Sequence, residues 1–523
     1  MALINVSNIT FCYEGSSVPV FENASFSIDA AWKTGLVGRN GRGKTTLLRL
    51  LAGELSASGT IDVPVRTVCF PFDVPDREMT GSEIFAQVCP EAQEWQLLRE
   101  LAATGTDAEA LYRPFSTLSG GEQTRLLLCM LFLHDGVFPL IDEPTNCLDD
   151  AARDAVAEYL SRKGGFILVS HDRDLLERCT DHTLSINRAD IELVKGGYAV
   201  WQENFERRQA FEEMQDKKLR GEISRLREAA RRSREWADTS ERRKIGFDPV
   251  KVEKSLTRRP YEAAKSKAMM KRALSTERRR LAAAEEKESL LKNREKSESL
   301  RLPAVIKRSG ALLTAQGVVP YRGGRALCAP VSFTLYSGDR LCLSGRNGCG
   351  KSTLLSIFAG ATDIEFDGSI NRAAGRASAA SRASAAGRAS AAGRASTAGV
   401  TVSLAEQDAS ALCGSLDEIA AARGGDPDLM RAILARLGFT HDELRACAQE
   451  LSEGQKKKAL IACSLSQRAD LYIWDEPLNF VDIISRIQLE RLLGEFSPTM
   501  LLAEHDRRFC RNTATTRLWL EEP

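Results

Sequence analysis

The sequence predicts an α/β protein made of two tandem copies of one domain, joined by an α-helical hairpin. The duplication is visible within the chain, because GRNGRGKTTLL at 38–48 recurs as GRNGCGKSTLL at 345–355. A chain of 523 residues is too long for one hydrophobic core and suits two domains of about 200 residues with a connector. The hydrophobic content of 43% and the charged content of 27% are typical of globular proteins.

Cysteine usage and hydropathy indicate the cellular setting. The 13 cysteines are scattered without a CxxC pair, and there are only five histidines, so a reducing compartment is expected and a disulfide framework or zinc site is not. No apolar run approaches about 18 residues, and the first ten residues lack the basic and apolar segments of a signal peptide. We therefore expect a cytoplasmic protein without a membrane span.

The repeated motifs divide the chain into a first domain at 1–200, a connecting segment at 201–302 and a second domain at 303–523. Apolar residues recur at helical spacing within the connecting segment, which predicts a helix. Pro249 and Pro260 interrupt this pattern and are expected to mark the turn between two antiparallel arms. A first arm of about 36 residues spans about 54 Å.

The net charge of +1 conceals a basic connecting segment. Residues 201–302 contain 29 Lys and Arg but only 19 Asp and Glu, so the rest of the chain is acidic on balance. Lys and Arg beside phosphates release counterions, and this favours a polyanionic partner at the segment. The alternative is a solvated pair of charged helices that acts only as a spacer.

Residues 372–399 form a low-complexity stretch inside the second domain. Arg-Ala-Ser-Ala-Ala-Gly repeats with a period of six, which fits neither a helix nor a strand. With almost no side chains that could pack, the stretch is interpreted as a flexible surface insertion. A contact between its arginines and RNA is the alternative.

Each copy contains a phosphate-binding P-loop of the form GxxxxGK[ST]. Both loops follow a strand-like run and precede a Leu-rich helix. Glycines let backbone amides surround phosphates at a helix N-terminus, the lysine neutralises charge, and the Thr or Ser hydroxyl ligates Mg²⁺. The predicted ATP-binding positions in the loops are Gly38, Asn40, Gly41, Gly43, Lys44, Thr45, Thr46, Gly345, Asn347, Gly348, Gly350, Lys351, Ser352 and Thr353, with Thr45 and Ser352 as Mg²⁺ ligands.

An apolar run ends in Asp-Glu-Pro downstream of each P-loop. The runs suit buried parallel strands and place Asp142 and Glu143 in one copy, and Asp475 and Glu476 in the other, at strand ends facing the P-loop. The aspartates are expected to hold Mg²⁺, and the glutamates to polarise the water that attacks the γ-phosphate. The alternative is that these buried acids have only a structural role, but such a role would not explain why each pair follows a P-loop.

Two further segments resemble the signature sequence of ABC ATPases: LSGGEQ at 118–123 and LSEGQ at 451–455. In that family the signature of one domain closes on the nucleotide that the other domain binds. The resemblance implies two ATP molecules held between head-to-tail domains of one monomeric chain. It pairs the first P-loop with Ser452 and Gly454, and the second with Ser119, Gly120 and Gly121.

Other residues match family positions. His171 and His505, each before an Asp, resemble the switch histidine that contacts the γ-phosphate and are placed with the catalytic residues. Tyr13 and Tyr321 are similar to the upstream aromatic of the ATP site. Gln407 resembles the Q-loop glutamine, which implies contacts with ATP and Mg²⁺.

The tandem copies, the charged connecting segment and the lack of membrane domains resemble the ABC-F branch, whose members act on ribosomes. GGYAVW at 196–201, AKSKAMMKR at 264–272 and LSEGQKKK from 451 are similar to segments of Lsa-type ribosomal-protection proteins, as is WDEPLNF from 474. The resemblance implies a linker that reaches 23S rRNA and the P-site tRNA and displaces lincosamides, pleuromutilins or streptogramin A. The candidate RNA-binding residues are Lys244, Lys251, Lys254, Arg258, Arg259, Lys265, Lys267, Lys271 and Arg272.

The chain departs from the family pattern at three places. Phe72 occupies the position where the family has the Q-loop glutamine of the first domain. Cys147 replaces the histidine of the family's NHLD motif, and the Arg-Ala-Ser repeat at 372–399 has no counterpart in the family pattern. These departures predict that the two nucleotide sites are unequal. The alternative functions are a housekeeping translation factor, the ATPase subunit of a transporter, and a DNA-associated clamp, although such clamps have much longer coiled coils.

Overall fold

The computed structural model covers most of both repeated copies and the first helix between them. It confirms the expected fold class, because each copy is an α/β domain with a P-loop between a central strand and a helix. Met1–Trp201 together with Leu300–Pro523 form one compact unit, and Gln202–Ser299 form a second. The described residues are 2–15, 19–134, 136–146, 148–187, 190–245, 275, 279, 310–361, 364–372, 400–521 and 523.

The strands of the first domain are β1 (Leu3–Phe11), β2 (Phe21–Asp29), β3 (Lys33–Gly38), β4 (Ser58–Asp62), β5 (Arg66–Phe70), β6 (Val137–Asp142), β7 (Phe166–Val169), β8 (His182–Ile186) and β9 (Ile191–Lys195). An antiparallel sheet has the order β2-β1-β4. A second sheet has the order β5-β6-β7-β3-β8-β9 and is parallel apart from β9. The buried apolar strands β6 and β7 are typical of a parallel sheet covered on both faces.

The second domain contains β10 (Ala311–Arg322), β11 (Arg325–Ala326), β12 (Val331–Tyr336), β13 (Arg340–Ser344), β14 (Phe366–Arg372), β15 (Val402–Ala405), β16 (Leu471–Asp475), β17 (Met500–Ala503) and β18 (Thr516–Trp519). Its antiparallel sheet is centred on β10, which pairs with β11, β12 and β14. Its parallel sheet has the order β15-β16-β17-β13-β18. This order matches β5-β6-β7-β3-β8 strand by strand, so the duplication seen in the sequence is also a duplication of topology.

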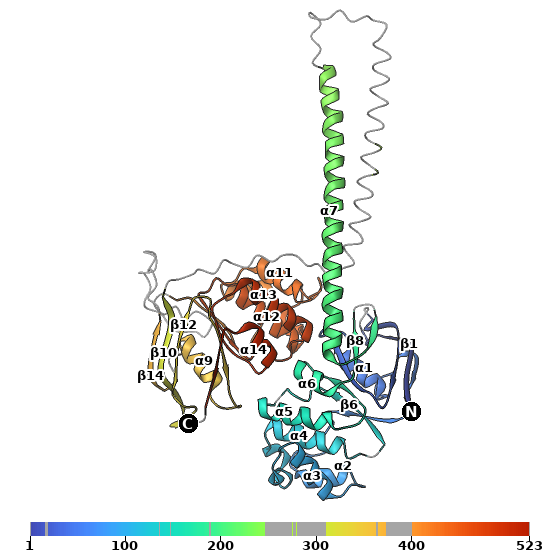
Figure 1. Cartoon of the computed structure of the whole chain (residues 1–523), viewed down its shortest axis with the longest axis vertical. Helices are drawn as coiled ribbons and strands as arrows, with labels where there is room; N and C mark the ends of the chain where they lie inside the picture. The colour runs from blue at the N-terminus through green and yellow to red at the C-terminus, as the bar shows by residue number, and fades with distance from the viewer. Residues whose placement is uncertain are drawn as a thin grey trace, which may run out of the picture. The chain divides into compact units, whose positions relative to one another are not determined.

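The helices of the two domains are α1 (Lys44–Leu51), α2 (Gly81–Val88), α3 (Glu94–Ala103), α4 (Gly120–Leu131), α5 (Asp150–Ser161), α6 (Arg173–Cys179), α9 (Lys351–Ala359), α10 (Leu416–Ala422), α11 (Pro427–Arg436), α12 (Glu453–Ser466), α13 (Ile483–Phe496) and α14 (Arg507–Thr513). Figure 1 shows α2, α3 and α4 gathered together in the first domain and α11 beside α12 in the second. The signature motifs therefore lie in the helical part of each domain, and the P-loops lie in the sheet part.

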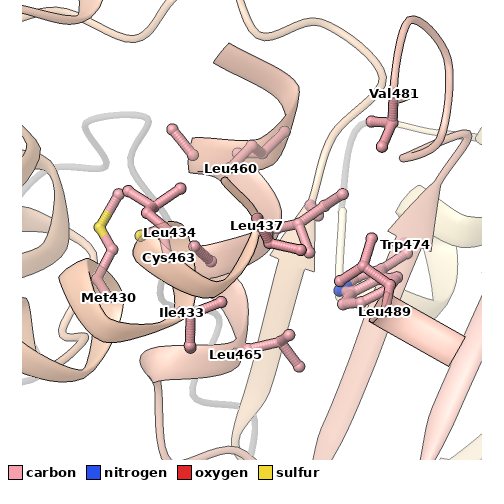
Figure 2. Packing of buried hydrophobic residues seen from close by; sticks show 14 of the residues in the cluster. Met430, Ile433, Leu434, Leu437, Leu460, Cys463, Leu465, Trp474, Val481 and Leu489 are labelled. Atoms are coloured by element: carbon pink, nitrogen blue, oxygen red, sulfur yellow. The ribbon is translucent and has the colours of Figure 1, made fainter. Parts of the chain in front are cut away.

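A hydrophobic core fixes α12, the helix that follows the LSEGQ segment. Figure 2 shows Leu434 of α11 and Leu437, the residue directly after α11, packed near Leu460 and Cys463 of α12, with Trp474 of β16 alongside. Eleven of the 14 residues of α12 are buried. Because each fully buried Leu contributes about 1.5–3 kcal/mol, this packing holds the N-terminus of α12 in one position.

The segment between the domains begins with α7 (Tyr198–Ile245), a single helix of 48 residues drawn in green in Figure 1. It is longer than the expected first arm of about 36 residues, because the helix continues through Gly221 as far as Ile245. At 1.5 Å per residue its length is about 72 Å. The predicted turn, the second arm and residues 373–399 lie outside the described residues, apart from Ser275 and Arg279. Arg372, predicted to begin the insertion, is instead the last residue of β14, where it pairs with Leu313 of β10.

Candidate active site

Each P-loop joins a buried strand to the N-terminus of a helix. β3 leads into α1 at Lys44, and β13 leads into α9 at Lys351. Gly43 and Gly350 precede these helices with φ of 86°, a left-handed conformation that favours glycine. A Cβ at Gly43 would also lie only 2.5 Å from Val20. Helix N-termini formed in this way present free backbone N–H groups to an anion.

The P-loop lysines fold back over their loops. Lys44 Nζ donates to the Gly38 carbonyl at 3.0 Å and to the Asn40 side-chain carbonyl at 3.2 Å. Lys351 Nζ donates to the Gly345 carbonyl at 2.9 Å. Burial lowers the pKa of Lys44, although neighbouring carboxylates partly offset that effect. Both ammonium groups therefore lie inside the loops, where phosphate oxygens are natural partners.

The acidic pairs lie at strand ends beside the P-loop hydroxyls, as the sequence predicts. Thr45 Oγ1 donates to Asp142 Oδ2 at 2.6 Å. In the second copy, burial raises the pKa of Asp475, although a hydrogen bond from Ser352 opposes that shift. Asp475 Oδ1 is buried and has no hydrogen-bond partner among the described residues. Hydroxyl and carboxylate oxygens in this arrangement are the hard ligands that Mg²⁺ prefers.

The signature serines are helix N-caps. The Ser119 hydroxyl accepts from Glu122 N at 3.3 Å, and the Glu122 carboxylate accepts from Ser119 N at 2.8 Å. Ser452 and Gln455 form the same reciprocal pair at α12, with distances of 3.4 and 2.9 Å. These capping boxes fix the start of α4 and of α12 and place the positive end of each helix dipole at its signature segment.

A cavity of about 410 Å³ connects the first P-loop with the signature of the second domain. The two segments approach closely, because a Cβ at Gly454 would overlap the Asn40 side-chain amide. The Tyr13 hydroxyl lies 2.8 Å from Thr46 Oγ1 at the same cavity. The predicted site residues that line it are Tyr13, Asn40, Gly41, Gly43, Lys44, Thr45, Thr46, Asp142, Glu143, His171, Ser452 and Gly454.

A different cavity, of about 610 Å³, lies at the second P-loop. Asn347 and Gly348 line it together with Asp149 and Ala152 of the first domain. Ser119 is not among its lining residues, so the structure does not bring the LSGGEQ segment to this cavity. The pairing of the second P-loop with Ser119, Gly120 and Gly121 stays a prediction.

Some predicted ATP-site residues have partners elsewhere. The Tyr321 hydroxyl donates to Asp367 Oδ2 at 2.9 Å, and Tyr321 does not line the cavity at the second P-loop. Gly120 lines another cavity, of about 650 Å³, together with Phe72. Ser352 and Thr353 lie in the first turn of α9.

Each catalytic candidate glutamate lies beside the switch histidine of its own domain. His171 Nε2 is 3.4 Å from Glu143 Oε1, and His171 N donates to Glu143 Oε2 at 3.2 Å. His505 Nε2 is 3.2 Å from Glu476 Oε1. Both glutamates have a positive φ, 49° at Glu143 and 45° at Glu476, so the two acidic pairs share one strained backbone shape.

The two glutamates differ in their other partners. Glu476 Oε2 accepts hydrogen bonds from Gln407 Nε2 at 3.0 Å and from Asn479 Nδ2 at 2.9 Å. Phe72, which replaces the glutamine in the first copy, lines the 650 Å³ cavity with Glu143 but has no side-chain donor. The departure noted in the sequence therefore leaves Glu143 without the hydrogen bond that Gln407 donates to Glu476.

Electrostatics amplify that difference. Burial and the neighbouring Asp142 raise the pKa of Glu143 to about 8. Burial acts in the same direction on Glu476, but His505 and nearby cations outweigh it and lower its pKa to about 2. Burial also holds the pKa of His171 well below its usual value, whereas two carboxylates raise that of His505 despite its burial.

Sequence reasoning missed Asp482, which links the two domains at the first site. Its carboxylate accepts from Asn40 N at 3.3 Å and from Lys458 Nζ at 2.5 Å. Asn40 Nδ2 also donates to the Phe480 carbonyl at 2.5 Å. The tandem duplication could have located this residue, because Asp482 and Asp149 occupy equivalent positions after the acidic pairs of the two copies.

Several predicted positions cannot be placed. Cys147 and the insertion at 373–399 lie outside the described residues, and nothing is described of the Lys244 side chain although its backbone belongs to α7. The other candidate RNA-binding residues outside the described part of the chain are Lys251, Lys254, Arg258, Arg259, Lys265, Lys267, Lys271 and Arg272.

Comparison with known proteins agrees with the geometry of the two P-loop sites. The ABC transporter family profile matches residues 21–146 and again 328–479, which together cover more than half of the chain. The chain belongs to the ABC transporter family. It is an ABC-type ATPase that binds ATP in two tandem domains.

Relatives match nearly the whole chain. Ribosome protection protein VmlR of Bacillus subtilis is 26% identical over 524 residues, covering 99% of this chain and 86% of that protein. Tylosin resistance ATP-binding protein TlrC of Streptomyces fradiae is 29% identical over 565 residues, covering 96% and 95%. These relatives confirm the resemblance to ABC-F proteins.

A solved structure has the same fold. The archaeal ribosome recycling factor aABCE1, in complex with the ribosomal stalk protein aP1, matches with a TM-score of 0.62 and 17% identity, covering 99% of this chain and 88% of that one. At this identity the likeness extends to the fold alone. Within the described part of the chain, none of the helices combines the length and the hydropathy required to cross a bilayer.

Proposed function

We propose that this ABC-F ATPase binds the ribosome and protects it from antibiotics that act at the peptidyl-transferase centre, of the lincosamide, pleuromutilin or streptogramin A type. The observation that carries this proposal is the basic segment 201–302 between the two ATPase domains, which begins with the 48-residue helix α7. A long helix within a basic segment suits a phosphate-rich partner. Its predicted targets are 23S rRNA and the P-site tRNA, which implies work in the cytoplasm as a monomer.

The names of the relatives also support a role in protecting ribosomes from antibiotics. VmlR is named a ribosome protection protein and TlrC a tylosin resistance protein, and both align across the domains and the connecting segment. A transporter subunit would not require this segment. A housekeeping translation factor would share the segment but would confer no drug resistance, so the experiment below separates the two functions.

The site residues suggest how ATP is used. In each domain the P-loop amides and lysine bind the phosphates, while the hydroxyl and carboxylate pair Thr45–Asp142 or Ser352–Asp475 would hold Mg²⁺. When bound, Mg²⁺ neutralises charge on the β- and γ-phosphates. The unpaired Asp475 Oδ1 fits a cation at this position.

The acid beside each pair has a separate role. Glu476, and Glu143 in its deprotonated form, orient and polarise the attacking water, and the histidine next to each glutamate holds its carboxylate in place. Ser452 and Gly454 of the other domain supply the N-terminus of α12 to the first site. ATP binding thereby stabilises contact between the domains. This contact is the step that would couple ATP to the action of the connecting segment on the ribosome.

The decisive experiment shortens the connecting segment at its predicted turn, which we call the linker tip. Residues 246–272 are replaced with a short Gly-Ser link, and a control replaces residues 373–399 with the same link. Both variants should keep ATPase activity, because the nucleotide sites lie in the two α/β domains. Ribosome co-sedimentation is measured together with inhibitory concentrations of lincosamides, pleuromutilins, streptogramins and macrolides in a drug-sensitive bacterium.

We expect the control to retain resistance and the tip variant to lose it. Undiminished resistance in the tip variant would overturn the protection function while leaving the ATPase intact. If the wild-type chain binds ribosomes but confers no resistance to any of these drugs, the housekeeping alternative replaces the proposal.

A further inference from the structure

The switch histidine of the second domain lies between two carboxylates that come from different domains. His505 Nδ1 is 3.7 Å from Asp150 Oδ1, and His505 Nε2 is 3.2 Å from Glu476 Oε1. Asp150 is the first residue of α5 in the first domain. Both Asp150 and His505 are 8% exposed. The Asp150 side chain of the first domain thus lies beside a residue of the hydrolysis site in the second domain.

The contact is part of a larger interface. Arg507, two residues after the histidine, donates to the Asp150 carbonyl at 3.2 Å and to Asp154 Oδ2 at 2.7 Å. In the other direction, Arg153 Nη1 donates to the His505 carbonyl at 3.5 Å. The first turn of α5 therefore holds both the backbone and the ring of His505.

The equivalent position in the other copy is apolar. TNCLDD at 145–150 aligns with LNFVDI at 478–483, which places Ile483 where the first domain has Asp150. Ile483 is 2% exposed and starts α13. In the described part of the chain, the carboxylate that pairs with the His171 ring is Glu143 of its own domain. The two switch histidines therefore differ in whether the opposite domain supplies an acid.

We propose that Asp150 is a positioning residue for the second nucleotide site: it orients the His505 ring across the domain interface so that Nε2 faces Glu476. Carboxylates near both ring nitrogens favour the doubly protonated imidazolium, so the ion pair with Asp150 at Nδ1 fixes the rotation of the ring while Nε2–H faces Glu476. His505 then holds Glu476 in place only while α5 of the first domain is docked. This proposal depends on ATP hydrolysis by the chain and not on its ribosomal role.

A purely structural role makes a different prediction. An acid in the first turn of α5 also stabilises that helix through its dipole. Loss of such stabilisation would weaken the first domain or the interface as a whole, without singling out the site of His505. The test must therefore distinguish the two histidines.

The test compares Asp150→Ala and Asp150→Asn with Ile483→Ala, the matched change at the equivalent position. ATP turnover is measured on the full chain against ATP concentration, and folding is checked by circular dichroism. We expect Asp150→Ala to lower kcat about tenfold with little change in KM, since outer-shell partners of a histidine have effects of this order. Asp150→Asn keeps the shape of the side chain and should lose less, and Ile483→Ala should stay near the wild-type rate.

The same Asp150→Ala change is then made in His505→Ala and His171→Ala backgrounds. We expect almost no further loss in the His505→Ala protein and the full loss in the His171→Ala protein, because coupled residues are not additive. An unchanged kcat in Asp150→Ala and Asp150→Asn would overturn the proposal. So would losses of similar size in both histidine backgrounds, which would indicate a structural role alone.

Discussion

The Arg173 guanidinium of the first domain is buried against the Asp506 carboxylate of the second, with Nη2 3.2 Å from Oδ1. The same nitrogen lies 2.5 Å from Glu490, and Arg486 reaches Asp506 from within the second domain at 2.9 Å. Asp506 directly follows the switch histidine His505. One charged cluster thus connects the interface of the domains to the hydrolysis site.

Removing Arg173 should strongly weaken the interface. We expect Arg173→Ala to cost about 3–5 kcal/mol, because it removes the buried cation shared by Asp506 and Glu490 and leaves Asp506 with Arg486 alone among the described cations. The control is Arg178→Ala, whose 2.8 Å pair with Asp154 is 44% and 46% exposed, and which should cost about 0–1 kcal/mol. Chemical denaturation and calorimetry of the three proteins measure the difference. Equal costs for the two variants would contradict the assignment.

Changing both catalytic candidates, Glu143 and Glu476, to Gln should keep ATP bound but block hydrolysis. The amide cannot polarise water as the carboxylate does, while the P-loops remain intact. We expect the double variant to retain nucleotide and to accumulate on ribosomes in co-sedimentation. Hydrolysis at the wild-type rate would exclude these glutamates as the catalytic groups.

Local motifs could be predicted from the sequence, and contacts between the domains could not. The P-loops, the acidic strand ends and the serine caps each involve residues a few positions apart, so spacing alone locates them. Asn40 and Asp482 are 442 positions apart, and Arg173 and Asp506 are 333 apart. Such pairs depend on how the domains dock, which no local period encodes. The length of α7 was underestimated because charged residues give a weak apolar pattern.

The two sites should contribute unequally to turnover. Glu476 receives hydrogen bonds from Gln407 and Asn479, whereas Phe72 can offer none to Glu143. We therefore expect Glu476→Gln alone to reduce kcat more than Glu143→Gln alone. Steady-state ATPase assays of both single variants check this order. Equal losses would mean that the glutamine partner does not limit the rate.

The repeat in the second domain should be dispensable. Arg372 itself belongs to β14 and donates to the Ile357 and Phe358 carbonyls at 3.2 and 3.0 Å, so a deletion should begin at Ala373. Joining Arg372 to Val400 through a short Gly-Ser link should leave ATPase activity and thermal stability nearly unchanged, because low-complexity insertions contribute little to a packed domain. Extending the deletion to include Arg372 should lower stability. If the deletion that begins at Ala373 abolished ribosome binding, the Arg-Ala-Ser repeat would have a function in that binding.

Basic residues at the predicted linker tip should determine how ribosome binding depends on salt. Each lost phosphate contact lowers the slope of log K against log salt by about 0.7–0.9, so changing Arg258 and Arg259 to Glu should flatten it by about 1 to 2. The weakening should be greatest at low salt, where the contacts contribute most. The control changes Arg207 and Arg232 of α7 to Glu, which alters the net charge equally at positions that already pair with Glu203 and Glu228. Co-sedimentation over a salt series measures both slopes. The same slope for both double variants would show that net charge, and not contact at the tip, governs binding.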